Sequence, residues 1–353
     1  MGTALTAALA LGALGACGQD DPVDVDAGIE LDAGPTPIDE IGFVAGDPLP
    51  AGTWLLANEW AGTPNQVFAL DPADLGGVAR TVFRSTRVWS MAAPPDGRAV
   101  VFSSNDPLQA ERFGVTIGDA IQNSFWFDTR ARTVRLLAPA GSGWANVNDE
   151  AFRVAPDGAH VYLSRRYDFT AEGAFQGWRL GRLGVADGGF EFLRPDVAGG
   201  PFELRPQQVP GTREVLFELR ARPPATGSAL HARHLDTGAE RLVRDGSGRP
   251  NLGPDGRRVL FADRTDQQRL KTFDLQAPGD PAVPVSPTAG AGDAAWSPDG
   301  ETSVYTVFDS ARSCDHLERV VWTGAGWSAP ERVRDCAQTG EFITNLAWVT
   351  IAP

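Results

Sequence analysis

The feature that most constrains the fold of this chain is a short turn motif that recurs along it. In its fullest copy, Pro298-Asp299-Gly300 is followed by a β-branched and aromatic run that ends at Phe308. Proline presets φ for the first central position of such a turn, aspartate suits the second, and glycine can take the left-handed conformation that closes a hairpin. Because one hairpin cannot bury its own faces, we expect it to pack against neighbours.

Further copies of the turn supply those neighbours. Each copy precedes a predicted strand of apolar and aromatic residues, and the copies are Pro95-Asp96-Gly97, Pro156-Asp157-Gly158, Pro254-Asp255-Gly256 and the degenerate Pro210-Gly211-Thr212. Successive prolines of the series lie 61, 54, 44 and 44 residues apart. A period near 44 residues is typical of one four-stranded blade of a β-propeller.

The run from Trp296 to Gly300, Trp-Ser-Pro-Asp-Gly before an apolar strand, resembles the TolB-type, WD-repeat-like β-propeller repeat of bacterial envelope proteins. Copies recur along nearly the whole chain after residue 45. The resemblance implies an all-β propeller in the cell envelope. Such blades occur in binding scaffolds, in regulatory halves of peptidases and in lipoproteins, so the resemblance implies no single activity.

We predict six blades of four antiparallel strands, with the ring closed by the C-terminal strand. The first predicted strand, 53–58, lacks an inner strand before it, and the segment 342–350 has an inner-strand pattern without a partner. Pairing these two segments would complete blade one and leave no open sheet edge. The other predicted blades are Val88–Leu137, Val147–Pro195, Phe202–Arg244, Pro250–Val285 and Asp293–Arg334.

Residues 1–17 are predicted to be a lipoprotein signal peptide. The apolar run 4–13 is too short to span a bilayer but suits the h-region of a secretory signal. Leu14-Gly15-Ala16-Cys17 resembles the bacterial lipobox, in which the cysteine is acylated, although no Lys or Arg precedes the apolar run. We therefore expect a lipid anchor on Cys17, the alternative being a buried apolar helix.

Residues 18–45 are predicted to form an acidic, disordered tether, with the propeller occupying 46–353. Eight acidic residues lie between Asp20 and Glu40 without a Lys or Arg, and few apolar side chains are available to offset the ordering entropy. The net charge of −14 is therefore concentrated at one end. Of the 31 basic residues all but Lys271 are scattered arginines, so we expect no nucleic-acid partner.

Two cysteines remain after Cys17. Cys314 and Cys336 flank the outer half of blade six, 22 residues apart. An exported compartment favours a disulfide between them, which would contribute about 3 kcal/mol for a loop of this length. The alternative is a pair of free buried thiols.

The sequence contains no catalytic motif that we recognise. His231 and His234 are predicted on opposite faces of one strand, where they cannot share a metal ion, and no Gly-x-Ser-x-Gly elbow is present. We therefore expect no cofactor, no metal and a scaffold rather than an enzyme. The alternative is a hydrolase of the lactonase or glycan-cleaving kind that uses acidic residues near the channel mouth, namely Asp149, Glu150, Glu203 and Asp293.

Long insertions are predicted on one face of the propeller, opposite the Pro-Asp-Gly turns. They span 105–121, 141–146 and 166–176, and long loops on a rigid scaffold often carry binding sites. We predict a monomeric, membrane-anchored scaffold facing the periplasm or exterior, with an unidentified envelope or cell-wall-associated partner. Because aromatic residues and Arg dominate interfaces, the candidate contacts are Arg112, Phe113, Trp144, Tyr167 and Phe169; the alternative is that the aromatics pack the loops down.

Overall fold

The computed structural model divides the chain into two units, 1–32 and 33–353, and all described residues belong to the second unit. The predicted signal peptide and Cys17 lie outside the described residues. Within the described part, no helix is long and apolar enough to cross a membrane. The structure describes residues 35–37, 43–60, 65–85, 88–106, 112–114, 122–137, 148–167, 177–195, 200–222, 224–336 and 340–353.

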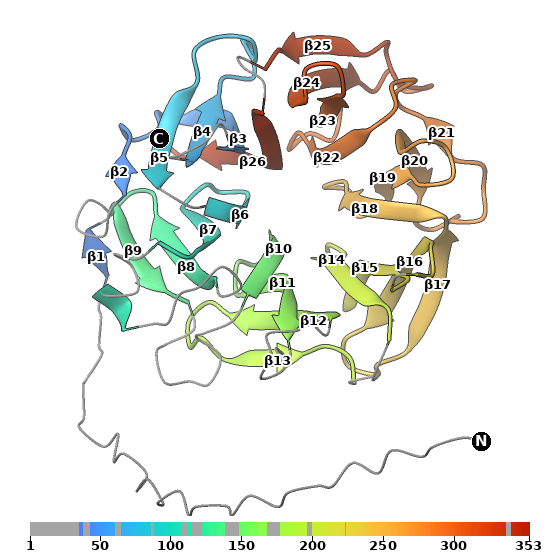
Figure 1. The fold of residues 1–353 in the computed structure, drawn as a ribbon, viewed down its shortest axis with the longest axis horizontal. Helices are drawn as coiled ribbons and strands as arrows, with labels where there is room; N and C mark the ends of the chain where they lie inside the picture. The colour runs from blue at the N-terminus through green and yellow to red at the C-terminus, as the bar shows by residue number, and fades with distance from the viewer. Residues whose placement is uncertain are drawn as a thin grey trace, which may run out of the picture. The chain divides into compact units, whose positions relative to one another are not determined.

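The described residues of the second unit form six antiparallel sheets arranged as blades around a central axis (Figure 1). This confirms the predicted six-bladed β-propeller. Blade two contains β6 (Val88–Ala92), β7 (Ala99–Ser104), β8 (Asn123–Asp128) and β9 (Thr133–Leu136). Blade three contains β10 (Asn148–Val154), β11 (His160–Tyr167), β12 (Gly177–Gly184) and β13 (Phe190–Phe192).

The next three blades repeat the same strand order from the axis outward. Blade four contains β14 (Phe202–Gln208), β15 (Glu214–Arg220), β16 (Ser228–His234) and β17 (Glu240–Asp245). Blade five contains β18 (Ser247–Leu252), β19 (Arg258–Asp263), β20 (Arg269–Asp274) and β21 (Val283–Pro284). Blade six contains β22 (Ala291–Trp296), β23 (Thr302–Asp309), β24 (Cys314–Val321) and β25 (Glu331–Arg334).

Blade one joins the two ends of the propeller. Its inner strand is β26 (Phe342–Ile351), which pairs antiparallel with β3 (Gly52–Trp60), so that Phe342 lies opposite Trp60 and Ile351 opposite Gly52. The predicted closure by the C-terminal strand is therefore confirmed. The blade continues outward with β4 (Asn65–Leu70) and β5 (Arg80–Ser85).

Two short strands extend the outer edges of blades one and two. β2 (Val44–Ala45) pairs with β5, and β1 (Thr36–Pro37) pairs with β9. Next to β2, Phe43 is only 2% exposed and packs edge-to-face on Phe83 and Phe102. Burying one Phe contributes about 2 kcal/mol, so the propeller begins before residue 46, the boundary predicted from the sequence.

The hydrophobic core lies between neighbouring blades because the second strands are buried on both faces. Successive side chains of a strand point to opposite faces. On β7, Val100 and Phe102 pack with blade one, whereas Val101 packs with Val161 and Leu163 of blade three. Each blade therefore depends on both of its neighbours, as expected for hairpins that cannot bury their own faces.

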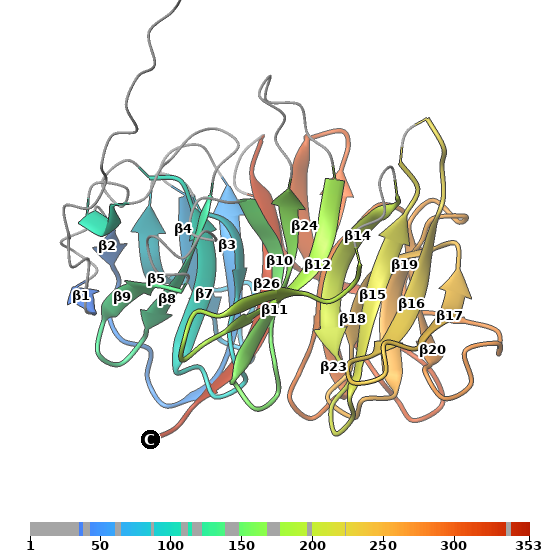
Figure 2. The ribbon, with the colours of Figure 1, turned by 90° about the horizontal axis from the view of Figure 1, so that it is seen from below.

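The Pro-Asp-Gly turns adopt the predicted geometry. Their glycines have φ between 62° and 70°, and each aspartate accepts a hydrogen bond from the backbone N–H two residues further on, as in Asp299 with Glu301 (2.9 Å). The N–H of Thr350 donates to the carbonyl of Pro95 (2.7 Å), which places the C-terminus on this face, at the lower edge of Figure 2. We call it the turn face.

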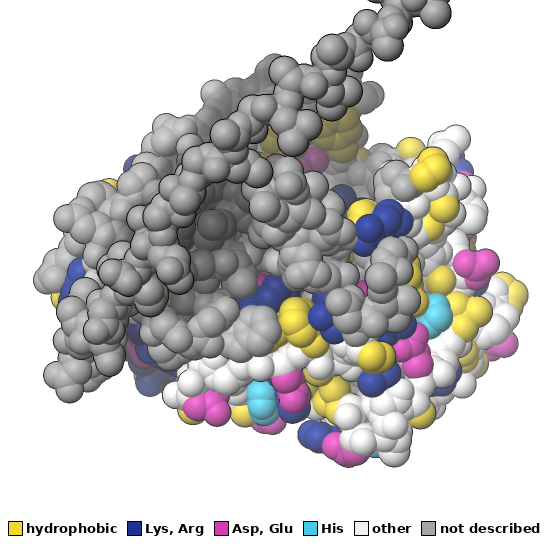
Figure 3. All heavy atoms as spheres, turned by 60° about the horizontal axis from the view of Figure 1, so that its bottom comes forward, with side chains coloured by type: hydrophobic (Ala, Val, Ile, Leu, Met, Phe, Trp, Pro, Cys, Tyr) yellow, Lys and Arg dark blue, Asp and Glu magenta, His cyan; other side chains and the backbone are white. Residues whose placement is uncertain are grey.

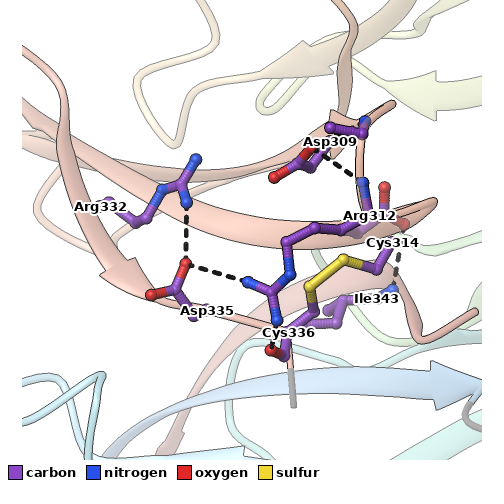
Figure 4. The surroundings of a disulfide bond; sticks show 9 residues. Asp309, Arg312, Cys314, Arg332, Asp335, Cys336 and Ile343 are labelled. Carbon is purple, nitrogen blue, oxygen red and sulfur yellow. Dashed lines mark hydrogen bonds and ion pairs between the residues drawn. A yellow bond between two sulfur atoms is a disulfide. The ribbon is translucent and has the colours of Figure 1, made fainter. Parts of the chain in front are cut away.

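The predicted disulfide between Cys314 and Cys336 is confirmed (Figure 4). Arg312 donates to the carbonyl of Cys336 (2.8 Å) and lies within ion-pair distance of Asp335. Beside the disulfide, Asp315 accepts a hydrogen bond from the N–H of Ile343 in β26 (3.1 Å). The cross-link therefore joins the outer half of blade six beside the strand that closes the ring.

Candidate functional site

The inner strands that surround the axis (Figure 1) share one irregularity, a shift in register near their middle. Such a shift marks a β-bulge, which redirects a side chain and locally disrupts the ladder. At four of the bulges a residue other than glycine has a left-handed φ of 53° to 56°, an unusual conformation that functional sites often contain. These four residues are Ala151, Arg205, Arg249 and Asn345.

A side chain from the preceding blade satisfies the backbone N–H of each left-handed residue. Ala151 donates to the Ser90 hydroxyl and Arg205 to the Ser164 hydroxyl, both at 3.0 Å. In the same way, the N–H of Arg249 donates to Glu218 (2.9 Å), and the N–H of Asn345 donates to Asp293 (3.0 Å). Because a buried N–H without an acceptor is costly, these contacts fix the bulges and tie neighbouring blades together.

The bulges surround a cavity of about 240 Å³ on the axis, which we call the bulge cavity. All six blades contribute to its wall. The bulge residues that line it are Ser90, Ala151, Arg205, Arg249, Asp293 and Asn345, and they are joined by Trp60, Trp89, Glu150, Arg153 and Thr344.

Charged side chains dominate this wall. Asp293 forms an ion pair with Arg249 (3.4 Å). Burial would raise the pKa of Asp293, but Arg249, Arg205 and the N–H of Asn345 together hold that pKa below its ordinary value. For Glu150 burial outweighs the nearby arginines and raises the pKa. The two carboxylates of the wall therefore differ, since only Asp293 is stabilised as an anion.

Behind the wall, the buried carboxylate of Glu218 forms ion pairs with several arginines. Its side chain is 0% exposed and forms ion pairs with Arg205 (3.5 Å), Arg220 (3.0 Å) and Arg264 (2.8 Å). Burial alone would raise the pKa of Glu218, but the arginines and the N–H of Arg249 lower it to about 2. Glu218 thus orients Arg205 and holds the bulge at Arg249.

Two further cavities lie along the axis, one on each side of the bulges. The outer cavity, about 500 Å³, opens opposite the turn face; it shares Trp60, Arg249, Asp293 and Thr344 with the bulge cavity and adds Phe308, Phe342 and Asp315. Burial raises the pKa of Asp315 to about 6. The turn cavity, about 310 Å³, is lined by the prolines of all five turns together with Trp296, Leu346 and Trp348.

The predicted contact residues of the insertions differ in their exposure. Arg112 is exposed, whereas Phe113 is 1% exposed and packs on Phe125 within the core of blades one and two. The expectation that Phe113 is available to a partner is therefore corrected, since its ring packs the insertion down. Tyr167 is the last residue of β11, and Trp144 and Phe169 lie outside the described residues.

The four acidic residues proposed for a hydrolase do not converge. Asp149 is bound by Arg165 (2.7 and 2.8 Å) and by Ser124, and Glu203 is bound by Arg194 and by the N–H of Leu180. The other two, Glu150 and Asp293, line the bulge cavity. Across the described ranges, no group of three or more His, Cys, Asp or Glu residues is placed to hold a metal ion.

Sequence reasoning missed the bulge cavity, although a signal for it was present. Arg205-Pro206 and Arg249-Pro250 recur 44 residues apart inside two inner strands. Proline cannot donate to a ladder, so within a sheet it marks an edge or a bulge. The repeated Arg-Pro pair therefore indicated both the irregular backbone and the arginines that line the cavity. Outside the channel, basic and acidic side chains of the described residues are intermixed on the part of the surface that is coloured in Figure 3.

The fold is similar to that of TolB from Acinetobacter baumannii, with 15% identity and a TM-score of 0.62 over 84% of this chain and 66% of that one. This chain therefore spans slightly less than two thirds of that protein. A protein assigned as TolB from Agrobacterium tumefaciens is 14% identical, with a TM-score of 0.56 over 85% of this chain and 99% of that one. Oligogalacturonate lyase in complex with manganese is 10% identical, with a TM-score of 0.51 over 81% of this chain and 84% of that one. No family model and no curated protein matches the sequence.

Proposed function

We propose that this protein is an exported, lipid-anchored propeller that acts as a binding scaffold of the bacterial envelope and catalyses no reaction. The observation that carries the proposal is that three of the four candidate acids are bound within the fold. Asp149, Glu203 and Asp293 each accept hydrogen bonds from an arginine and from a further donor. The fourth, Glu150, lines the bulge cavity, and a rigid ring with axial cavities is suited to binding.

The disulfide supports an envelope location. Disulfides form and persist in oxidising compartments, including the bacterial periplasm, and Cys314–Cys336 is buried beside the ring closure. The similarity of the fold to TolB agrees with this location. The lipobox at Leu14-Gly15-Ala16-Cys17 supplies the anchor in this proposal.

Replacing Cys17 by Ser tests the anchor. The wild-type protein should incorporate a fatty-acid probe and fractionate with membranes, whereas Cys17→Ser should do neither. Cys314→Ser is the matched control, because it removes a cysteine that is outside the lipobox and should leave labelling unchanged. Identical labelling and fractionation of wild type and Cys17→Ser would reject the anchor.

The partner is proposed to bind the face that carries the insertions, opposite the turn face. Affinity capture from envelope extracts should recover the partner, and Arg112→Ala, Trp144→Ala, Tyr167→Ala or Phe169→Ala should include one variant that loses about 2 kcal/mol of binding free energy. Phe113→Ala should instead lower the melting temperature, because its ring is buried. Lower melting temperatures with unchanged binding for all four other variants would place the interface elsewhere.

A further inference from the structure

We propose that the bulge cavity is a binding site for a small organic monocarboxylate, with its carboxylate at Arg153, Arg205 and Arg249 and its apolar body in the outer cavity. The three arginines come from the inner strands of three consecutive blades, β10, β14 and β18, and all of them line the bulge cavity. A guanidinium group presents N–H donors in a fork that matches a carboxylate. This inference is independent of the partner proposed for the insertion face.

Arg153 provides the least satisfied cation of the site. Its guanidinium donates to the backbone carbonyl of Phe152 (2.8 Å) and forms no ion pair in the described part of the chain. Burial lowers the pKa of Arg153, and Arg205 lowers it further against the opposing effect of Asp293. A half-buried guanidinium that lacks a bound carboxylate, on the wall of a cavity, indicates a place for an anionic group from outside.

Trp60 contributes a second unsatisfied donor to the same wall. Its indole Nε1 is buried without an acceptor among the described residues, and its ring packs edge-to-face on Trp89 with centroids 4.9 Å apart. Trp60 lines both the bulge cavity and the outer cavity. Because a buried indole N–H usually has a partner, a ligand oxygen at the junction of the two cavities would supply one.

The charges of the wall favour an anionic ligand. Three arginines line the bulge cavity together with two carboxylates, Glu150 and Asp293. Burial raises the pKa of Glu150, so that only Asp293 is stabilised as an anion, while Glu218 pairs with Arg205 from behind the wall. The guanidinium of Arg153 is thus the cation of the wall that a ligand carboxylate would pair with.

The outer cavity favours an apolar body for the ligand. Phe308 and Phe342 lie nearly parallel, with centroids 6.3 Å apart, and Ala291 and Ile343 also line this cavity. It joins the bulge cavity through Trp60, Arg249, Asp293 and Thr344. Together the cavities match an anionic head attached to a ring or a short chain.

The test uses the full propeller and three probes measured by calorimetry or ligand-observed NMR. Phenylacetate carries the head and the body, phenylacetamide is its neutral isostere, and inorganic phosphate is the alternative anion. We expect phenylacetate to bind at least tenfold more tightly than phenylacetamide, with affinity that falls as salt is added. Equal binding of the two, or binding of phosphate without phenylacetate, would overturn the proposal.

Variants locate the site. Arg153→Gln should weaken phenylacetate binding at least tenfold, and Arg205→Gln provides a second reading if the first variant folds poorly. The matched control is Arg213→Gln, which removes an exposed arginine that pairs with Asp236 on the surface and should leave binding unchanged. Phenylacetate binding that survives in both channel variants, or is lost equally in the control, would also overturn the proposal.

Discussion

The turn end and the bulge of each inner strand differ in where the contacts that fix their conformation come from. At the turn end, a Pro-Asp-Gly motif sets its own conformation through contacts within a few residues, as when Asp299 accepts the N–H of Glu301. At the bulge, a backbone N–H is satisfied from another blade, as when Glu218 accepts the N–H of Arg249. The turns therefore repeat a short motif, whereas each bulge has its own partner.

This difference extends to the cavities. The turn cavity is built from the repeated prolines and from apolar residues such as Trp296 and Leu346. The bulge cavity is lined by a different residue from each blade and carries both arginines and carboxylates. Repetition thus produces the rigid ring, and the departures from repetition produce the chemically specific part of it.

Opening the ring should have the largest effect, because both regions require closure. Deleting residues 342–353 removes β26 and with it the contributions of Asn345 to the bulge cavity and of Trp348 to the turn cavity. It also exposes the edge of β3, so we expect aggregation rather than a shifted melting temperature. Removing only the exposed residues 352–353 is the control. A soluble long deletion that melts like the control would contradict the closure.

Glu218→Gln should cost about 3 kcal/mol of unfolding free energy, because it removes a fully buried carboxylate that pairs with three half-buried arginines. Since the pKa of Glu218 is about 2 in the folded protein against 4.5 ordinarily, its contribution is present above pH 4.5 and is lost as pH falls toward 2. Denaturant titrations at several pH values should show this loss in the wild type and not in the variant.

The control for Glu218 is Glu214→Gln on the same strand, which removes a partly exposed pair with Arg241. It should cost less than about 1 kcal/mol. Equal costs for the two glutamates would mean that the bulge contacts stabilise the propeller no more than surface pairs do.

Substitutions at two turn glycines separate the backbone strain within a turn from the contact that a turn makes with the closing strand. Gly211 has φ +70° with nothing within 4 Å of an added Cβ, so Gly211→Ala should cost only the left-handed strain, about 1 kcal/mol. At Gly97, with φ +62°, the Cβ would lie 2.3 Å from Ile351 of the closing strand, which should raise the cost to about 2 kcal/mol. Thermal melts at two pH values should show both costs unchanged by pH; equal costs would deny the contact with β26.

The smallest predicted effect is a gain. The pKa of Asp315 is raised to about 6 in the folded protein against 3.8 ordinarily. The folded protein therefore binds this proton more tightly than the unfolded chain does, and it loses stability as the pH rises from 3.8 to about 6. Asp315→Asn should therefore raise the unfolding free energy at pH 8 by about 1 kcal/mol, after allowance for partial exposure. The exposed Asp335→Asn is the control. An unchanged or lower stability of Asp315→Asn would show that the carboxylate is stabilised at that site.

Much of the fold could be predicted from the sequence because its determinants are local or repeated. The turns identify the hairpins, their spacing identifies the blades, and the unpaired pattern of 342–350 identifies the closure. The sequence assigns Phe43 to the tether because the short apolar run Phe43-Val44-Ala45 follows an acidic segment and is too short to give a periodic signal, although the core of two blades buries the Phe43 ring.

The candidate site was harder to predict because it depends on contacts between blades. Nothing near Glu218 in the sequence indicates that Arg264 and the N–H of Arg249 lie beside it. The sequence predicts Phe113 as an interface residue, but a loop aromatic can either face solvent or pack inward, and the ring of Phe113 packs inward. The Arg-Pro pairs at 205 and 249 were the usable signal, since they combine a bulge with a cation at the same step of the repeat.

A crystal of the propeller soaked with 4-bromophenylacetate tests most directly whether the bulge cavity is the chemically specific part of the ring. The anomalous signal of bromine locates the ligand body without reference to activity. We predict a peak in the outer cavity, near Phe342 and Trp60, with carboxylate density at Arg153. A peak in the turn cavity against Trp296 and Leu346, or no peak on the axis, would contradict the account.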